Sequence, residues 1–277
     1  MPATAALDWI SHAFVTARRS AAALDGFPGS QPDDLATAYA IQDRSRASWP
    51  DRVIGWKVGL VPPAFRERLG TDRLAGPIFR RSLWYSNPAE PTLFPVFVGG
   101  FAAVEAEFIV QLAEDLPPGS GPIGPAEAER LAGDLFIGVE TAGSPLATIN
   151  ALGPTVVVSD FGNNAGLILG PRIPDWRTRS PESLTVRTIV DGVTVGAGSA
   201  ASVPGGPLAA FRFLLDHARA RAIPLKAGDL VTTGATTGIH EVVPGNQARV
   251  IFDAVGEIAC TAVAATPDTL TRPAEGA

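Results

Sequence analysis

Apolar residues near the start of the chain recur at alternating spacings of three and four, which is the period of one helix face. They predict an amphipathic helix over Leu7–Leu24 that ends near Asp25–Gly26. A second helix is predicted from Asp33–Asp34, whose side chains can cap its N-terminus, to the residues before Pro50. Further helices are predicted over residues 62–70, 126–133 and 204–218.

Short apolar and β-branched runs predict strands through the rest of the chain. Asp191–Gly192 lies between two such runs and is typical of a type I′ hairpin turn. Helices therefore concentrate in the first third and strands in the remainder, without the regular alternation of a doubly wound sheet, so we predict an α+β fold. The predicted strands are Val53–Val58, Val104–Leu112, Leu135–Glu140, Thr155–Ser159, Leu167–Leu169, Leu184–Val190, Val193–Val195, Leu230–Thr233, Ala248–Phe252 and Ile258–Val263.

Charge and composition narrow the classes of protein that remain. The 277 residues include 22 Lys plus Arg and 28 Asp plus Glu, which gives a net charge of −6. Because nucleic acids and anionic membranes attract basic surfaces, we expect neither as a partner. Asp8 and His12 interrupt the first apolar run, so we expect no signal peptide, and the uncharged stretches 141–159 and 192–211 are too broken to span a membrane. The single cysteine, Cys260, excludes an intramolecular disulfide and suits a cytoplasmic protein.

Two carboxylates share one face of a predicted strand. Glu105 and Glu107 alternate with small and apolar residues, and Phe108–Val110 after them is apolar on both faces. Either the strand is half-exposed with a solvated acidic face, or it enters the core and carries both carboxylates inward, where a cation must relieve their repulsion. Glu140, at the end of another apolar strand, supplies a third ligand. Three carboxylates without His or Cys favour Mg²⁺ or Mn²⁺, with about half of the coordination shell left for water and substrate.

Lys57 lies in the middle of an apolar strand, with glycines two residues away on each side. It either snorkels from an edge strand or points into a pocket, where it binds a carboxylate or transfers a proton. Two polar loops leave a similar choice open. Residues 160–164, with Asp160 and two asparagines, form a turn or a pocket wall, and residues 232–238 form a polar loop or an anion site.

Five motifs occur in order along nearly the whole chain. Each motif alone is weak, but the ordered set resembles the 2-keto-4-pentenoate hydratase family. That family also contains 2-oxohept-3-ene-1,7-dioate hydratases and 4-oxalocrotonate decarboxylases, and it lies within the fumarylacetoacetate hydrolase superfamily. The motifs are GWKVGL (55–60), VEAE (104–107), GVE (138–140), SDFGNNAGL (159–167) and KAGDLVTTG (226–234).

The resemblance implies a mixed β-roll or barrel-like core with an N-terminal helical portion. We accordingly expect the helical portion with the first strands over residues 1–95 and the catalytic mixed-β core over 96–277, integrated into one domain. The residues that match the family pattern are Glu105, Glu107 and Glu140 for the divalent metal, Lys57 as the active-site lysine, Asp160 at the edge of the site, and Thr233 and Gly234 near the substrate carboxylate.

One segment departs from the family pattern. Hydratases of this family commonly carry an acidic residue in the segment that corresponds to residues 76–84, where this chain has Arg80 and Arg81. Arg80 either binds a second carboxylate of the substrate or belongs to a solvated arginine pair. Asp160 is then the remaining candidate to position water, and Asn164 is a candidate to bind the substrate.

The resemblance implies a lyase. We expect a Mg²⁺- or Mn²⁺-dependent hydratase that adds water to a 2-hydroxy-2,4-dienoate (2-oxo-4-pentenoate-like) to give a 4-hydroxy-2-oxo acid, in the catabolism of aromatic compounds. The nearest alternative is a 2-oxo-3-enedioate decarboxylase of the 4-oxalocrotonate type. A C–C hydrolase of the acylpyruvate or fumarylacetoacetate type and a non-catalytic partner subunit fit less well. The family also implies a homo-oligomer, or a complex with a related decarboxylase or hydratase.

Overall fold

The structure is a computed structural model that describes residues 3–116, 119 and 121–267. Its helices are α1 (Ala3–Ser20), α2 (Leu35–Ser48), α3 (Pro63–Leu69), α4 (Pro125–Leu131), α5 (Ile149–Leu152), α6 (Pro154–Ser159) and α7 (Gly206–Ala220). Its strands are β1 (Val53–Leu60), β2 (Arg73–Phe79), β3 (Leu83–Tyr85), β4 (Thr92–Val96), β5 (Phe101–Leu112), β6 (Ala132–Ser144), β7 (Asn164–Arg172), β8 (Thr185–Val190), β9 (Val193–Ser199), β10 (Leu230–Thr232), β11 (His240–Glu241), β12 (Gln247–Phe252) and β13 (Gly256–Ala264).

The described strands form two sheets around one main core. The larger, curled sheet has the order β2-β1-β10-β5-β6-β7-β3, with β11 paired to β5, and the smaller sheet has the order β4-β13-β12-β8-β9. Phe108 of β5 and Phe252 of β12 meet edge to face, with ring centroids 5.5 Å apart, so the two sheets bury their apolar faces against each other. The α+β fold class is thus confirmed.

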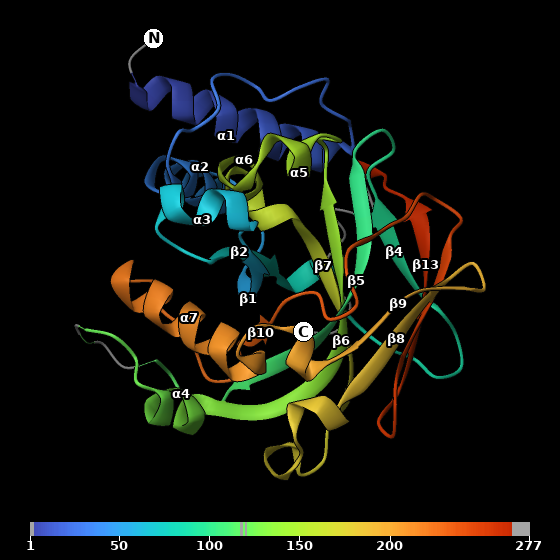
Figure 1. Cartoon of the computed structure of the whole chain (residues 1–277). Coiled ribbons are helices and arrows are strands. Elements are labelled where there is room, and N and C mark those ends of the chain that lie inside the picture. Colours follow the sequence, from blue (N-terminus) through green and yellow to red (C-terminus); the bar gives the residue numbers. More distant parts are fainter. Residues whose placement is uncertain (1–2, 117–118, 120, 268–277) are drawn as a thin grey trace.

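Helices cover the two ends of the larger sheet. In Figure 1, α1, α2, α3, α5 and α6 gather at one end, and α7 and α4 lie at the other. The helix α7 places Phe211, Leu214 and Leu215 in the main core, whereas α1, α2 and α6 build a smaller apolar cluster around Ile41. None of the helices in the described ranges is long and apolar enough to span a membrane.

Local signals fix several of these elements as expected. Asp34 caps α2 by accepting a hydrogen bond from the Thr37 amide, and Gly70 ends α3 in the left-handed conformation, with φ of 66°. Asp191 and Gly192 both have positive φ, 48° and 80°, as a type I′ hairpin between β8 and β9 requires. β1 pairs with β10 across the expected boundary at residue 95, and that boundary falls inside β4, which pairs with β13; the domain division itself stays a prediction.

Two expectations about elements were wrong, and four strands were not predicted. Residues 155–159 form helix α6 instead of a strand, because Pro154 at the first helical position starts a helix and a short apolar run fits either element. The helix α1 ends at Ser20 and not near Leu24, since Ala21 turns the chain with φ of 54°. Sequence analysis also missed β2, β3, β4 and β11. Two of them, β2 and β4, contain a proline and lie at sheet edges, where the missing amide hydrogen costs no ladder bond.

Candidate active site and metal centre

Three buried glutamates meet on one face of the larger sheet. Glu105 and Glu107 lie on β5, and Glu105 stands directly opposite Glu140 of the antiparallel neighbour β6. Each of the three offers a carboxylate oxygen, and these oxygens lie within 4.8 Å of one another. The exposed fractions are 5% for Glu105 and 0% for the other two. The interpretation of β5 as a solvated acidic strand is therefore wrong, because the strand runs through the interior along almost its whole length.

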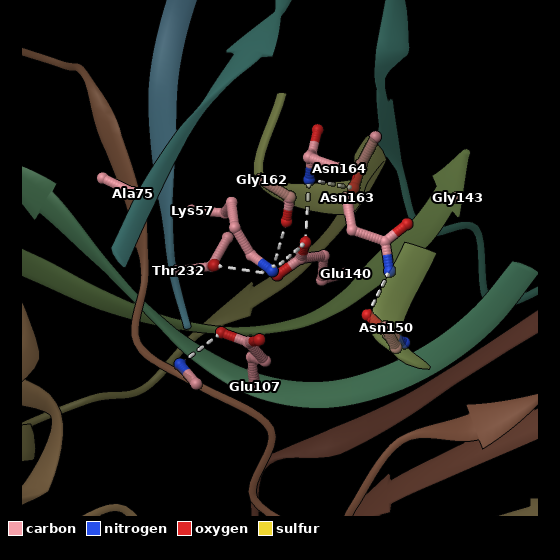
Figure 2. A network of polar contacts seen from close by, with 12 residues as sticks. Lys57, Ala75, Glu107, Glu140, Gly143, Asn150, Gly162, Asn163, Asn164 and Thr232 are labelled. Atoms are coloured by element: carbon pink, nitrogen blue, oxygen red, sulfur yellow. Dashed lines mark hydrogen bonds and ion pairs between the residues drawn. The ribbon is translucent and has the colours of Figure 1, made fainter. Parts of the chain in front are cut away.

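Polar neighbours hold two of these carboxylates in place (Figure 2). Glu140 Oε1 accepts a hydrogen bond from Asn164 Nδ2 at 3.0 Å and forms an ion pair with Lys57 Nζ at 3.3 Å, while Oε2 accepts from Thr232 Oγ1 at 3.2 Å. Glu107 Oε2 accepts from the amide of Gly234 at 2.6 Å. The other oxygen, Glu107 Oε1, is buried and has no hydrogen-bond partner among the described residues.

The three buried carboxylates repel one another, and a bound cation would relieve this repulsion. Burial, and next the nearby Glu140, raise the pKa of Glu105 to about 7. The same two causes, followed by Glu105, raise the pKa of Glu107 well above its ordinary value. A divalent ion among the three would compensate the charges and give Glu107 Oε1 the partner that it lacks. Because carboxylate oxygens are the ligands that hard cations prefer, the residues present fit such an ion.

Lys57 points at the carboxylate cluster from the neighbouring part of the sheet. Its strand, β1, lies between β2 and β10, and the side chain is 6% exposed, so the snorkelling interpretation is wrong. Its Nζ donates to the carbonyl of Gly162 at 3.0 Å. Burial alone lowers the pKa of Lys57, but the attraction of the three carboxylates, led by Glu140, outweighs it and raises that pKa. The lysine is therefore a charged hydrogen-bond donor in the structure.

A glycine lets the loop approach Lys57. Gly76 of β2 stands beside Lys57 in the antiparallel β1–β2 pair. A Cβ at Gly76 would lie 2.0 Å from the carbonyl oxygen of Phe161, so only glycine allows the Phe161–Asn163 turn to pack here. That close approach brings the Gly162 carbonyl to Lys57.

A cavity of about 380 Å³ opens beside the cluster. Lys57 and Glu105 supply its charged groups, and Asn150 and Asn163 supply amides, with Asn163 Nδ2 donating to Asn150 Oδ1 at 3.3 Å (Figure 2). The remaining lining is apolar or glycine and consists of Gly59, Leu60, Pro62, Leu74, Gly153, Pro154, Val157, Ala235, Gly238 and Ile239.

Asp160 does not line this cavity. Its carboxylate accepts hydrogen bonds from Arg18 Nε at 2.5 Å, from another Arg18 nitrogen at 2.9 Å and from Ser144 Oγ at 2.6 Å. Arg18 also donates to the carbonyls of Asn164 and Gly143. Both oxygens of Asp160 are therefore hydrogen-bonded. The Arg18–Asp160 ion pair joins α1 to the loop 160–164 and can hold that loop in place.

Sequence analysis missed Arg18, although a signal existed. The buried apolar stripe of α1 contains Ile10, Phe14 and Ala17, and Arg18 lies eight residues after Ile10 on the same face. A charged residue in the apolar stripe of a helix needs a buried partner, and Asp160 is that partner.

Other predicted site residues lie at the carboxylates or away from the cavity. Asn164 and Gly234 contact Glu140 and Glu107 directly, and the Thr233 hydroxyl donates to the carbonyl of Phe108 at 2.8 Å. Arg80 follows β2 in the turn η1 (Arg80–Ser82), four residues beyond Gly76 and hence roughly 13 Å along the chain from the position beside Lys57. It is not among the residues that line the cavity.

No family model matches the chain. The chain is 28% identical over 249 residues to a protein named 2-keto-4-pentenoate hydratase from Burkholderia vietnamiensis, with 86% of this chain and 88% of the relative covered. It is 27% identical to a protein of the same name from Paraburkholderia xenovorans, with 84% of this chain and 85% of the relative covered. The chain is thus similar over most of its length to proteins named 2-keto-4-pentenoate hydratase. The resemblance stated from the motifs is thus confirmed.

Solved structures share the fold of this chain. A 4-oxalocrotonate decarboxylase from Pseudomonas putida G7, complexed with magnesium and adipate, superposes with a TM-score of 0.77 at 20% identity and covers 93% of this chain and 97% of its own. A fumarylpyruvate hydrolase from Pseudomonas aeruginosa, in complex with Mn²⁺ and pyruvate, gives a TM-score of 0.54 at 17% identity, with 78% and 91% covered. The mixed-β core predicted from the resemblance is therefore correct.

Proposed function

We propose that the protein is a divalent-metal-dependent hydratase that adds water to a 2-hydroxy-2,4-dienoate and releases a 4-hydroxy-2-oxo acid, in the breakdown of aromatic compounds. The observation that carries the proposal is the cluster of three buried glutamates, with an unpartnered oxygen on Glu107, beside a cavity that Lys57 and Glu105 line. The homology to proteins named 2-keto-4-pentenoate hydratase supports the reaction class.

Glu105, Glu107 and Glu140 are the residues that would hold Mg²⁺ or Mn²⁺. When bound, the ion supplies a Lewis acid for the carboxylate and C2 oxygen of the substrate, which is where negative charge develops. Asn164 and Thr232 then fix Glu140, and the Gly234 amide fixes Glu107, so that the ligands are held before substrate arrives.

Lys57 has one donor left for the substrate. Its ammonium has three N–H groups, of which one is directed to Gly162 O and one to Glu140. The third can bind a substrate oxygen in the cavity, where the positive charge stabilises the enolate form of the substrate. We assign Lys57 the orientation of the substrate and the stabilisation of this charge.

The reaction needs two additions to the carbon chain. The enol proton leaves the C2 oxygen and a proton adds at C5, after which the oxygen of water adds at C4 and its hydrogen at C3. Asn163 is the lining residue best suited to position this water, because its Oδ1 is buried and has no hydrogen-bond partner within the described part of the chain. Asp160, the candidate from the sequence, acts through its pair with Arg18 on the loop that carries Asn163.

The proposal is tested by product mass. Purified protein is incubated with 2-hydroxypenta-2,4-dienoate, and separately with a dicarboxylic analogue, in the presence of Mg²⁺ or of a chelator. We expect the pentadienoate to gain one water only when the metal is present. Loss of carbon dioxide from the dicarboxylic analogue would instead identify a decarboxylase, and no reaction with either substrate under any metal would refute an enzyme of this class.

We also propose a homo-oligomer. Two large apolar side chains, Leu93 on β4 and Val98 just after it, are 60% and 58% exposed, and apolar groups of this kind commonly mark contacts between subunits. Light scattering coupled to size-exclusion chromatography measures the mass in solution, and a monomeric mass at micromolar concentration would contradict this proposal.

A further inference from the structure

Apart from Lys57, Glu105, Asn150 and Asn163, the cavity has an apolar or glycine lining. Leu74 and Val157 line it, together with proline and glycine residues from the ends of β1, α3 and α6. Two of the lining side chains, Leu60 and Ile239, are 41% and 54% exposed. Large apolar groups thus extend from the lining to the solvent-accessible surface, where polar residues would be the ordinary choice.

The cavity is larger than the smallest dienoate. A volume of about 380 Å³ corresponds to roughly a dozen water-sized groups. A five-carbon 2-hydroxydienoate has eight non-hydrogen atoms, of which the carboxylate and the C2 oxygen belong at the metal and Lys57. Space for several further atoms therefore remains along the apolar lining, in the direction of the substrate tail.

The lining offers no cation for a second carboxylate. Lys57 is the only basic residue among the described lining residues, and it is already directed to Glu140 and Gly162. Neither of the two arginines closest in sequence to the lining is itself a lining residue, and both donate to neighbours. Arg66 Nε donates to the Val61 carbonyl at 2.7 Å, and Arg73 binds Asp72 and the Pro204 carbonyl. An anionic tail would lose its hydration here without gaining a charged partner.

We propose that this site selects 2-oxo or 2-hydroxydienoate acids with an uncharged apolar tail that extends beyond carbon 5, and that it discriminates against dicarboxylates of the same length. The inference rests on the proposed function for the position of the substrate head, and it assigns Leu74, Val157 and Ile239 to the tail. An enzyme for dienedioates would need a cation at the tail, and the described lining residues offer none for it.

The test uses binding, so that it does not depend on turnover. The ligands are saturated 2-oxo acids, which keep the head group but cannot be hydrated, and binding is measured by calorimetry with Mn²⁺ present. We expect the dissociation constant to fall about fourfold for each methylene from 2-oxopentanoate to 2-oxoheptanoate. We expect 2-oxohexanedioate, which carries a second carboxylate at the tail, to bind at least about tenfold more weakly than 2-oxohexanoate.

A matched pair of variants then checks the position of the tail. Ile239→Arg places a cation at the lining without disturbing the core, and Val243→Arg is the control, because Val243 is 62% exposed and does not line the cavity. Ile239→Arg should tighten 2-oxohexanedioate by up to about fivefold, in a salt-dependent manner, and Val243→Arg should not.

The outcomes separate the two proposals. Equal or tighter binding of 2-oxohexanedioate by the unmodified protein, or no gain with chain length, would overturn the inference about the tail. Chain-length dependence together with the absence of any hydration of dienoates would leave the tail pocket in place and overturn the hydratase function instead.

Discussion

Replacing Glu107 with glutamine should stabilise the metal-free protein and reduce the stabilisation that metal adds. In Glu107→Gln, the amide oxygen would keep the acceptor that binds the Gly234 amide, while the NH₂ group would face the two remaining carboxylates at the place of the unpartnered oxygen. The substitution therefore preserves shape and hydrogen bonding and removes one negative charge from a fully buried position.

Without metal the variant should be more stable than the unmodified protein at pH 8. The folded-state pKa of Glu107 is raised by burial and then by Glu140, so the folded state binds its proton more tightly than the unfolded chain does. That stabilising proton is retained below the ordinary pKa of 4.5 and is lost as the pH rises through the raised value, so stability falls with pH. Each unit of raised pKa costs about 1.4 kcal/mol once the group is ionised, and glutamine avoids this cost.

Metal should stabilise the unmodified protein more than the variant. An ion present at one hundred times its dissociation constant stabilises the folded state by about 2.7 kcal/mol. An entropy of unfolding of about 2.1 cal/mol/K per residue gives this 277-residue chain about 0.6 kcal/mol per degree, so Tm should rise by about 5 °C. The Glu107→Gln variant, with a neutral and weaker ligand, should gain less than about 1 °C.

The assay is differential scanning calorimetry at pH 5 and pH 8, with chelator or with Mn²⁺. The control is Glu241→Gln, an exposed glutamate on β11, the strand that also pairs with β5. The reasoning is refuted if the chelated Glu107→Gln variant is the less stable protein at pH 8, or if Mn²⁺ raises the Tm of both proteins equally.

Three further predictions concern the support of the site. Lys57→Met should lower kcat by at least about a hundredfold, because the positive charge that faces the developing anion is lost. Calorimetry with Mn²⁺ should still show that the variant binds the metal. An unchanged kcat would contradict the role of Lys57. Arg18→Met should destabilise the protein by about 3–5 kcal/mol, because it leaves the buried Asp160 carboxylate without its cation. In urea unfolding, adding Asp160→Asn should recover part of that loss. Additive effects of the two changes would argue against the ion pair. Gly76→Ala should lower the free energy of unfolding by about 3 kcal/mol or more in the same assay, because its Cβ would overlap a backbone carbonyl. The control is Gly26→Ala, where a Cβ meets nothing within 4 Å, and it should lower that free energy by less than about 1 kcal/mol.

The sequence predicted those parts of the site that regular strands place. Period two along β5 put Glu105 and Glu107 on one face, and the apolar run after them indicated burial, which the structure confirms. The pairing of Glu105 with Glu140 depends on the register of β5 and β6, which no local pattern specifies. Glu140 is assigned to the cluster because it ends another apolar strand and two carboxylates alone would make a poor metal site, and the motif resemblance agrees with that assignment.

The sequence failed where long-range contacts decide the structure. The run 155–159 has strand propensity, but packing against α2 and a proline at its start make it helical. Asp160 resembled a catalytic acid because its partner Arg18 lies 142 residues away. Only the folded chain shows that Asn164 and Gly234 bind Glu140 and Glu107, and their contact with substrate stays a prediction.

The central claim is that Glu105, Glu107 and Glu140 hold a divalent ion that binds the head of the substrate. The most direct measurement is anomalous diffraction from crystals grown with Mn²⁺ and 2-oxohexanoate. The account predicts one strong peak about 2.0–2.3 Å from an oxygen of each glutamate, with the carboxylate and C2 oxygen of the ligand completing the shell and Lys57 Nζ within hydrogen-bond distance of the ligand. A manganese peak elsewhere in crystals of active protein, with the three glutamates unliganded, would contradict it.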